Sequence, residues 1–414
     1  MMAGAVAGQE ITRRIRRQVD EKAETLIRIR QATRVVQELG HLKGAAMKAG
    51  QMLALEGRDF LPDEVVQVLE KLQNSVSFMD EAQVKKILQA ELGSRYSQLS
   101  DLQFPPIAAA SIGQVHRARR GDQSLAIKVQ YPGIQDGLES DLKVLGRVLK
   151  GLVRAMGRQI NIEGMLEEFG QIFLQESDYL QEARFLARYR ACAEGMEGVL
   201  IPQPHPELST SRILTMDYLP GETLTRWVRD NQPSQEDRTA IGQLILELYT
   251  REFCEWGLVQ TDPNPGNFLV RPDDRKLILL DFGACKEFAP AFRTQYSRLV
   301  MAVVRRHDPE LFALSDQLGL IDPRESAETR AALKELLYAS MAPITQGIYD
   351  FTDEAYLPMV RQLGRKFAFS LKYSPPPRNL IFLHRKLSGV FFMLKTLGVR
   401  LELASHLARF EALA

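Results

Sequence analysis

The residues that could carry chemistry lie close together in the second half of the chain. Asp262 begins the segment Asp-Pro-Asn-Pro-Gly-Asn, which ends at Asn267, and Asp281 begins the tripeptide Asp-Phe-Gly soon afterwards. Phosphoryl transfer needs hard oxygen ligands that hold one or two Mg²⁺ ions, and a separate carboxylate that accepts the proton of the attacking hydroxyl. We therefore interpret Asp262 as the base and Asn267 and Asp281 as metal ligands.

Each of these motifs also has a purely structural interpretation. The first could be a turn, and Asp-Phe-Gly could be the end of a strand. Either motif alone would be weak evidence, but their order and hairpin spacing favour the chemical interpretation. Pro263 and Pro265 support it, because they stiffen the loop between the base and the first metal ligand.

A lysine upstream is a candidate phosphate ligand. Lys128 lies in the run Leu-Ala-Ile-Lys-Val and alternates with apolar neighbours, as a strand residue that points into a cleft would. A lone strand lysine is usually solvated, but an acidic segment, residues 176–182, can supply its carboxylate. Asp178 and Glu182 are four residues apart and would share a helix face, whereas Glu176 would point elsewhere. We expect one of these carboxylates to pair with Lys128 and another to serve a different purpose.

The surrounding pattern predicts short strands first and mainly helices later. Three strands are expected over residues 104–109, 113–118 and 125–130, with a hairpin turn at Gly121-Asp122. Helices are expected over residues 138–156 and 162–190, followed by short strands over 199–202 and 212–216 that lead into a hinge. After the hinge only residues 258–282 break the helical pattern, with strands over 268–270 and 277–280 joined by a turn at 271–274.

The first part of the chain, residues 11–75, has an amphipathic helical pattern with many arginines. Two interpretations are open. The helices could be solvated on one face and packed on the rest of the protein, or one of them could lie on an anionic membrane surface as a peripheral anchor.

Composition excludes several classes of protein. The chain has 414 residues, with 53 Lys and Arg against 52 Asp and Glu, so its formal charge of +1 does not favour nucleic acid as a partner. Its three cysteines lack the spacing of a disulfide framework or a thiolate metal site, which favours a reducing compartment such as the cytoplasm. The order of apolar and basic residues at the start is not that of a secretion signal, and no stretch predicts a transmembrane helix.

The chain resembles the UbiB (AarF) family of atypical kinases. The kinase-like order of Asp262, Asn267 and Asp281 is joined by three further motifs. Lys48-Ala49-Gly50-Gln51 is similar to the family's K-x-G-Q helix. The segment from Ala108 to Val115 is similar to its Ala-rich loop, and Glu176-Ser177-Asp178 is similar to its E-x-D motif. The motifs are spread from about residue 39 to 397.

The resemblance implies an α+β, bilobal, protein-kinase-like fold with an N-terminal helical extension. We expect the extension over residues 1–100, a small β-rich lobe over 101–217 and a helical lobe over 218–414. It further implies that Lys128 pairs with Glu182. Glu176 and Asp178 would then face Lys48 and Gln51 of the extension, as regulatory contacts over the place that a protein substrate would occupy.

The expected nucleotide-binding residues follow from the same pattern and are Ala108, Ala109, Ala110, Ser111, Gly113, Lys128, Asp217 and Leu219. In the loop three alanines stand where a Gly-rich loop would let backbone N–H groups approach phosphates, so nucleotide would bind less conventionally. The resemblance implies that this loop alters nucleotide preference and restrains protein phosphorylation. Ser111 could bind a phosphate or its own backbone, and both interpretations stay open.

The segment that carries the proposed base, residues 260–267, is called the catalytic loop below. It departs from the patterns of regulated kinases and of the family. Thr261 stands where regulated kinases carry the arginine that reads a phosphorylated activation loop, and no Ala-Pro-Glu signal follows Asp-Phe-Gly. Gln260 and Asn264 stand where the family usually has two histidines. Since neither is a base or metal ligand in this scheme, the change concerns loop packing and rate.

The sequence therefore predicts an atypical kinase or ATPase that uses ATP (or ADP) and Mg²⁺. It would act on, or support the metabolism of, a small lipidic or phenolic ligand, and only the resemblance links that ligand to quinones. The alternative is a nucleotide-gated regulatory or chaperone-like pseudokinase. A true protein kinase is disfavoured by the Ala-rich loop and by Thr261.

Overall fold

The computed structural model describes residues 78–110, 112–133, 138–155, 166–167, 170, 173–174, 177–262, 264–345, 347–373 and 378–414. The chain divides into two compact units. The first comprises Met1–Ile87, Phe104–His116 and Lys128–Ser177, and the second comprises Leu88–Gln103, Arg117–Ile127 and Asp178–Ala414. The domain boundaries expected from the sequence stay predictions.

A four-stranded sheet contains the hairpins expected from the sequence. Its strands are β1 (Ala108–Ala110), β2 (Gly113–Arg120), β3 (Gln123–Gln130) and β5 (Ile213–Asp217), in the order β1-β2-β3-β5. β1 and β2 are antiparallel, with Ala110 opposite Gly113. The first strand begins later than expected, at Ala108, because Pro105 and Pro106 have no N–H to give to a ladder.

A glutamine at the start of β2 anchors the segment before the first described helix, α4 (Glu81–Leu92). The buried Gln114 side chain accepts a hydrogen bond from Met79 N at 2.8 Å and donates one to Met79 O at 3.3 Å. A short 3₁₀ turn, η3 (Gly93–Gln98), follows α4.

The two helices of the acidic region differ in part from expectation. α5 (Leu138–Ala155) matches the predicted helix. α7 (Tyr179–Cys192) begins afresh at Tyr179, with Asp178 as its N-cap, instead of continuing one helix from residue 162. The Asp178 carboxylate accepts hydrogen bonds from Leu180 N and Gln181 N, at 3.0 and 3.3 Å, which is the capping role that aspartate favours at a helix start.

A second sheet carries the strands on either side of the predicted turn. Its order is β4 (Val199–Leu200), β9 (Lys276–Leu279), β8 (Phe268–Arg271) and β6 (Glu222–Thr223). β8 and β9 form the expected antiparallel hairpin, and Arg271 closes it through a bidentate contact with Asp274. Next to this sheet, β7 (Leu258–Gln260) pairs with β10 (Cys285–Glu287), which joins the chain before Asp262 to the chain after Gly283.

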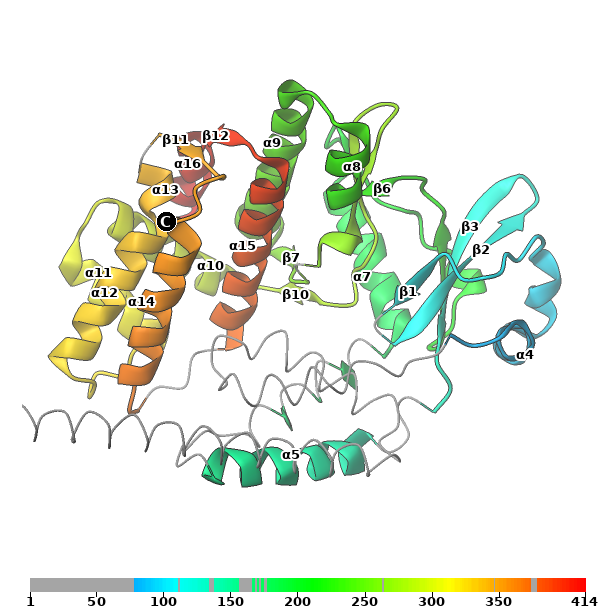
Figure 1. The fold of residues 1–414 in the computed structure, drawn as a ribbon, viewed down its shortest axis with the longest axis horizontal. Helices are drawn as coiled ribbons and strands as arrows, with labels where there is room; N and C mark the ends of the chain where they lie inside the picture. The colour runs from blue at the N-terminus through cyan, green and yellow to red at the C-terminus, as the bar shows by residue number, and fades with distance from the viewer. Residues whose placement is uncertain are drawn as a thin grey trace, which may run out of the picture. The chain divides into compact units, whose positions relative to one another are not determined.

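The remainder of the second unit is mainly helical (Figure 1). The helices and turns are η4 (Pro206–Leu208), α8 (Leu224–Asn231), α9 (Gln235–Arg251), η5 (Glu252–Trp256), η6 (Pro265–Asn267), α10 (Pro290–Val304), α11 (Asp308–Gln317), α12 (Ala327–Ser340), α13 (Ala342–Thr345), α14 (Tyr356–Ser370), α15 (Arg378–Leu397) and α16 (Ala404–Leu413). A small sheet of β11 (Ile348–Asp350) and β12 (Arg400–Glu402) was not predicted.

Helix α15 is the element of this unit that matters most for the site. It packs against α8 and α9 (Figure 1), and its inner face buries Leu383, Met393 and Leu394. These contacts fix both its position and its rotation. Among the described residues no helix is long and apolar enough to cross a membrane.

Candidate active site

The carboxylate of Asp262 is held at both of its oxygens. Oδ2 accepts a hydrogen bond from Asn267 Nδ2 at 2.6 Å. Oδ1 accepts one from Asn264 N at 3.3 Å and one from Arg385 Nη2 at 3.2 Å. A carboxylate held in this way has a defined direction, which a general base needs before its substrate arrives.

The contact between Asp262 and Asn267 also orients the amide of Asn267. Because the amide nitrogen donates to Asp262, its carbonyl oxygen lies on the other side of the amide group, where it can act as a ligand. The backbone of the loop supports this arrangement. Asn264 caps the short turn η6 by accepting a hydrogen bond from Gly266 N at 3.0 Å, so its side chain acts in loop packing.

Asp281 and Glu182 both lie beside Gly283. Asp281 Oδ1 accepts a hydrogen bond from Gly283 N at 3.0 Å. A Cβ atom built on Gly283 would be 3.3 Å from Asp281 Oδ1 and 3.5 Å from Glu182 Oε2. The structure therefore brings together Glu182 of α7 and Asp281, two carboxylates that the sequence analysis placed in one site.

The phenylalanine between these residues ties α7 to the same region. Phe282 is fully buried, and its ring lies 4.8 Å from that of Tyr189, two helical turns beyond Glu182. Tyr189 in turn packs edge-on against Trp256 at 5.4 Å. The packing of Phe282 thus fixes α7, and with it Glu182, against the Asp-Phe-Gly segment.

Beneath the loop is a buried polar network centred on Glu252, whose side chain is fully buried. Glu252 Oε1 accepts hydrogen bonds from Tyr189 Oη at 2.7 Å and from Gln260 N at 3.0 Å, and Oε2 is 3.0 Å from Lys386 Nζ. Burial raises the pKa of Glu252, while Lys386 and the two hydrogen bonds favour its ionised form. The network joins α7, η5, β7 and α15.

Gln260 links this network to the Asp-Phe-Gly segment. Its Nε2 donates to the main-chain oxygen of Asp281 at 3.3 Å, and its Oε1 accepts from Lys386 Nζ at 3.2 Å. Thr261 makes a parallel contact, since its hydroxyl donates to Ala284 O at 2.6 Å. The two residues before Asp262 therefore fix the main chain on both sides of Phe282.

Sequence reasoning missed Arg385 and Lys386. In the sequence they are part of a basic run that precedes an apolar stretch, and nothing in their spacing connects them with residues 252–262. The structure brings them to Asp262 and Glu252 through the packing of α15. The only signal available was a pair of basic residues on a helix that is otherwise strongly apolar on one face.

The nucleotide-binding residues predicted in the first unit are only partly described. Lys128 is a residue of β3, as predicted, and is buried at 5% exposure; its role as a phosphate ligand stays a prediction. Ala108, Ala109 and Ala110 form β1, and Gly113 begins β2. Lys48, Gly50, Gln51, Ser111 and Glu176 lie outside the described residues, and so does Pro263.

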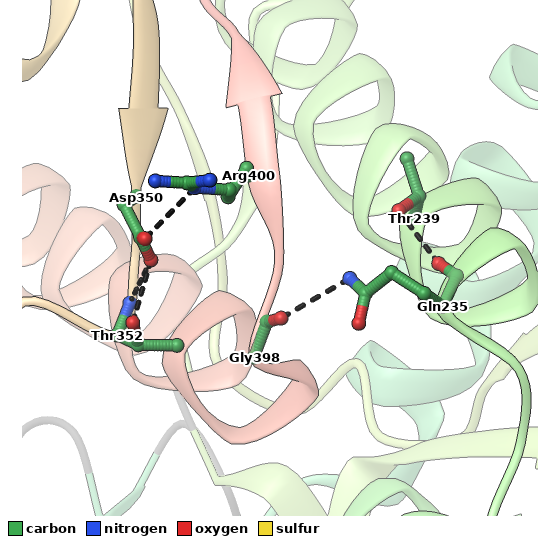
Figure 2. A pocket seen from close by; sticks show the side chains of 6 residues that line it. All are labelled: Gln235, Thr239, Asp350, Thr352, Gly398 and Arg400. Carbon is green, nitrogen blue, oxygen red and sulfur yellow. Dashed lines mark hydrogen bonds and ion pairs between the residues drawn. The ribbon is translucent and has the colours of Figure 1, made fainter.

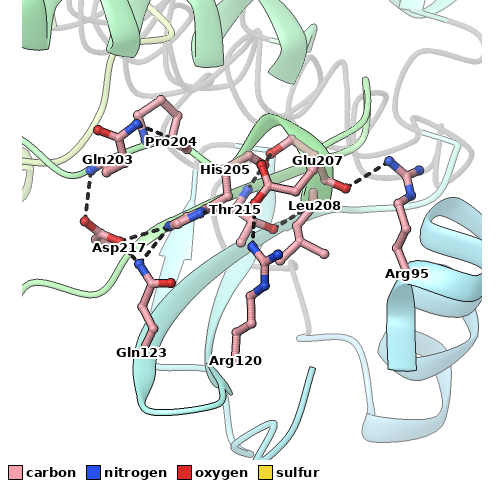
Figure 3. A network of polar contacts seen from close by, with 11 residues as sticks. Arg95, Arg120, Gln123, Gln203, Pro204, His205, Glu207, Leu208, Thr215 and Asp217 are labelled. Carbon is pink, nitrogen blue, oxygen red and sulfur yellow. Dashed lines mark hydrogen bonds and ion pairs between the residues drawn. The ribbon is translucent and has the colours of Figure 1, made fainter. Parts of the chain in front are cut away.

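At the expected hinge, the side chain of Asp217 belongs to a polar network (Figure 3). Its Oδ1 accepts hydrogen bonds from Gln123 Nε2 at 2.8 Å and pairs with His205 Nε2 at 2.9 Å, and Oδ2 accepts one from Gln203 N at 3.3 Å. The carboxylate therefore fixes the end of β5, from which the chain continues to Leu219. Asp178, besides capping α7, lies 3.8 Å from Arg184.

The donor set fits Mg²⁺ held together with nucleotide phosphates. In the described part of the chain no group of three or more His, Cys, Asp and Glu side chains could hold a metal by itself. Mg²⁺ in phosphoryl-transfer sites usually has one or two protein oxygen ligands, with phosphate and water completing the shell. One carboxylate, Asp281, and one amide oxygen, Asn267, match that pattern.

Cys285 is not a reactive thiol in this structure. It is buried at 1% exposure, and burial raises the pKa of its thiol well above the usual value.

An open hollow of about 450 Å³ lies elsewhere in the second unit (Figure 2). It is lined by Gln235, Thr239, Asp350, Thr352, Gly398 and Arg400. Its polar groups bond to one another: Asp350 accepts from Thr352 and from Arg400, and Gln235 donates to Gly398 O. None of the predicted site residues lines it.

The chain is similar in sequence to known atypical kinases. A family model described as the ABC1 atypical kinase-like domain matches residues 71–314. The atypical kinase COQ8, mitochondrial, of Schizosaccharomyces pombe is 33% identical over 89% of this chain and 60% of its own length. The COQ8 protein of Saccharomyces cerevisiae is 30% identical over 90% of this chain and 74% of its own length. A probable serine/threonine-protein kinase, abkA, of Dictyostelium discoideum is 30% identical over 87% of this chain and 67% of its own length.

The chain spans about 60% of the length of the first two of these curated relatives, the S. pombe protein and the COQ8B protein of Danio rerio. Among solved structures, Rv3197 from Mycobacterium tuberculosis, determined as a complex with erythromycin, superposes with a TM-score of 0.64 at 25% identity. The match covers 94% of this chain and 97% of that one. The expected α+β, kinase-like fold is confirmed, and the chain belongs to the ABC1 (UbiB, aarF) family of atypical kinases.

Proposed function

We propose that this chain is a Mg²⁺-dependent phosphotransferase or ATPase that uses ATP. The observation that carries the proposal is the orientation of the Asn267 amide, which donates to Asp262 and so presents its oxygen as a ligand. A dead pseudokinase would have no need for a base and a metal ligand that hold each other in this way. Asp281, Gly283 and Glu182 support the same assignment from the neighbouring segment.

Each residue has a distinct role in the proposed reaction. Asp262 accepts the proton of the attacking hydroxyl or water at its carboxylate. Asn267 and Asp281 would hold Mg²⁺, which, when bound, neutralises charge on the transferred phosphoryl group. Lys128 contacts nucleotide phosphates and Glu182 orients it, in the pairing that kinases use.

The nucleotide is held by the β1–β2 hairpin and by the hinge after Asp217. Ala108, Ala109 and Ala110 form a regular strand instead of a Gly-rich loop, so fewer backbone N–H groups are available for phosphates. We infer that affinity for the nucleotide depends more on Mg²⁺ and Lys128 than in Gly-rich kinases.

The acceptor is proposed to be a small lipidic or phenolic molecule, with a link to quinone synthesis. The names of the COQ8 relatives support the link to quinone synthesis. The same relatives are named as mitochondrial, and the basic amphipathic pattern of residues 11–75 supports contact with an anionic membrane surface. Co-sedimentation with anionic liposomes, with and without residues 1–35, tests the membrane contact.

The first experiment is phosphate release from Mg-ATP, measured with and without lipid and small phenols. We expect release that an additive stimulates and that Asp262→Asn abolishes, because the base is lost. Mg-nucleotide affinity should stay within about twofold, because the carbonyl oxygen of an asparagine at 262 can still accept the hydrogen bond that orients Asn267. Asp273→Asn, on the exposed β8–β9 turn, is the matched control. Tight nucleotide binding with no release under any condition would instead identify a nucleotide-gated regulator.

A further inference from the structure

An arginine of helix α15, far along the chain, lies beside the carboxylate of Asp262 in the catalytic loop. Arg385 of α15 and Asp262 are 123 residues apart in sequence, and Arg385 Nη2 lies 3.2 Å from Asp262 Oδ1. Both side chains are largely shielded, at 18% and 25% exposure. A charge-assisted hydrogen bond in such a place is stronger and more directional than one on the surface.

The next residue along α15 fixes the helix in position. Lys386 is 2% exposed and its ammonium lies 3.0 Å from Glu252 Oε2 and 3.2 Å from Gln260 Oε1. Consecutive residues of an α-helix project about 100° apart. Lys386 therefore enters the buried network beneath the loop, while Arg385 reaches the loop itself.

The loop has no arginine of its own next to the base. Thr261 precedes Asp262, and its hydroxyl donates to Ala284 O. In regulated kinases the arginine at this place pairs with a phosphorylated residue, and that pair orders the site. Here the ordering charge pair joins two side chains of the unmodified chain.

We propose that Arg385 is a positioning residue that holds Asp262 in its working orientation, so that α15 orders the catalytic loop without phosphorylation of an activation segment. The inference rests on the proposed role of Asp262 as the base. Without Arg385, the one hydrogen bond that Oδ1 keeps among the described residues is the longer one from Asn264 N, at 3.3 Å. The carboxylate can then turn about its hydrogen bond to Asn267.

The test uses the full chain with Arg385→Ala, Arg385→Lys and the control Arg365→Ala, an exposed arginine of α14. Three quantities are measured: hydrogen exchange of residues 260–267, phosphate release, and Mg-nucleotide affinity. We expect Arg385→Ala to raise exchange of the loop about tenfold and to lower kcat about a hundredfold, as misplacement of a catalytic group does, with nucleotide affinity nearly unchanged. Arg385→Lys should recover part of the loss, and Arg365→Ala should resemble the unsubstituted protein.

Chemical rescue separates positioning from a general loss of structure. Added methylguanidinium should restore part of the activity of Arg385→Ala and none of that of Asp262→Asn. Treatment of the unsubstituted protein with a phosphatase should leave its activity unchanged.

Unchanged exchange or unchanged kcat in Arg385→Ala would overturn the inference, as would loss of activity on phosphatase treatment. Failure of the proposed function looks different. If the unsubstituted protein releases no phosphate while Arg385→Ala still raises exchange of the loop, the phosphotransferase is rejected and Arg385 is kept as the residue that orders the loop.

Discussion

The side-chain amide of Gln260 donates a hydrogen bond to the main-chain oxygen of Asp281 at 3.3 Å. This contact joins the strand before the proposed base to the residue proposed to bind Mg²⁺. Gln260 also accepts a hydrogen bond from Lys386, so this one side chain connects Asp281 with the buried pair of Lys386 and Glu252.

Removal of both hydrogen bonds of Gln260 should weaken the site. We expect Gln260→Leu to cost about 1–3 kcal/mol of unfolding free energy, because the Asp281 carbonyl and the Lys386 ammonium each lose a partner in a buried place. Gln260→His should cost less, since a neutral imidazole keeps one donor and one acceptor. Urea unfolding measures both, and equal stability of Gln260→Leu and the unsubstituted protein would refute the link.

The buried pair of Lys386 and Glu252 should show strong coupling. Lys386→Met leaves the Glu252 carboxylate buried without its cation, which costs about 3–5 kcal/mol. The double variant Lys386→Met/Glu252→Gln should be much less destabilised than the sum of the two single changes. Chemical denaturation of the four proteins gives the coupling energy, and simple additivity would show that the pair does not act as a unit.

A substitution at Gly283 tests whether Asp281 faces the metal of the nucleotide. A methyl group at this position would lie 3.3 Å from Asp281 Oδ1, closer than most Cβ contacts, so Gly283→Ala should displace that carboxylate and weaken Mg-nucleotide binding about tenfold, or about 1.4 kcal/mol. Gly364→Ala is the matched control, because open space surrounds Gly364 in α14, and there alanine should stabilise the helix by about 0.5–1 kcal/mol. Normal affinity in Gly283→Ala would place the Asp281 carboxylate outside the metal site.

Asp281→Asn tests the metal assignment directly. Loss of a carboxylate ligand should lower Mg-dependent nucleotide affinity by more than about a hundredfold, beyond what changes in outer partners usually cost. Calorimetry with and without Mg²⁺ measures the effect. Intact Mg-ATP affinity in this variant would remove Asp281 from the site.

The predictions from sequence succeeded where the signal was local. Turn residues between two apolar runs predicted the hairpin of β8 and β9, which carries the chain from Asn267 to Asp281. In the acidic segment the same local view failed, because Asp178 competes for backbone N–H groups and starts a new helix instead of lying within one.

Arg385 and Lys386 could not be predicted, because their partners are more than 120 residues away. The rotation of α15 that brings them to Asp262 and Glu252 is set by packing against α8 and α9, and a single sequence does not display that packing. The strands β11 and β12 were missed for a related reason, since three residues are too few to show an alternating pattern.

Acid should weaken the contact between α9 and α16 through Glu247. Burial opposes ionisation of Glu247, but hydrogen bonds from Arg409 and Arg251 outweigh it and hold the pKa below the usual 4.5. Because the folded pKa is lowered, this stabilisation is present above pH 4.5 and is lost as the pH falls through the folded value.

Glu247→Gln should therefore lower the unfolding free energy by about 1 kcal/mol at pH 7 and flatten the decline below pH 4.5. Glu354→Gln, at an exposed position, is the control. Thermal melts from pH 7 to 3 measure the stability of both variants. If Glu247→Gln and the unsubstituted protein lost stability equally as the pH fell below 4.5, the acid sensitivity would not come from Glu247.

The burial of Phe282 also bears on inhibitor design. A compound that must occupy the space of this ring has to expel it from its contact with Tyr189, which costs about 1.5–3 kcal/mol of lost burial before any new contact forms. The hydrogen bonds of Gln260 and Thr261 to the main chain on either side add to that barrier. Inhibitors that leave Phe282 in place avoid this cost.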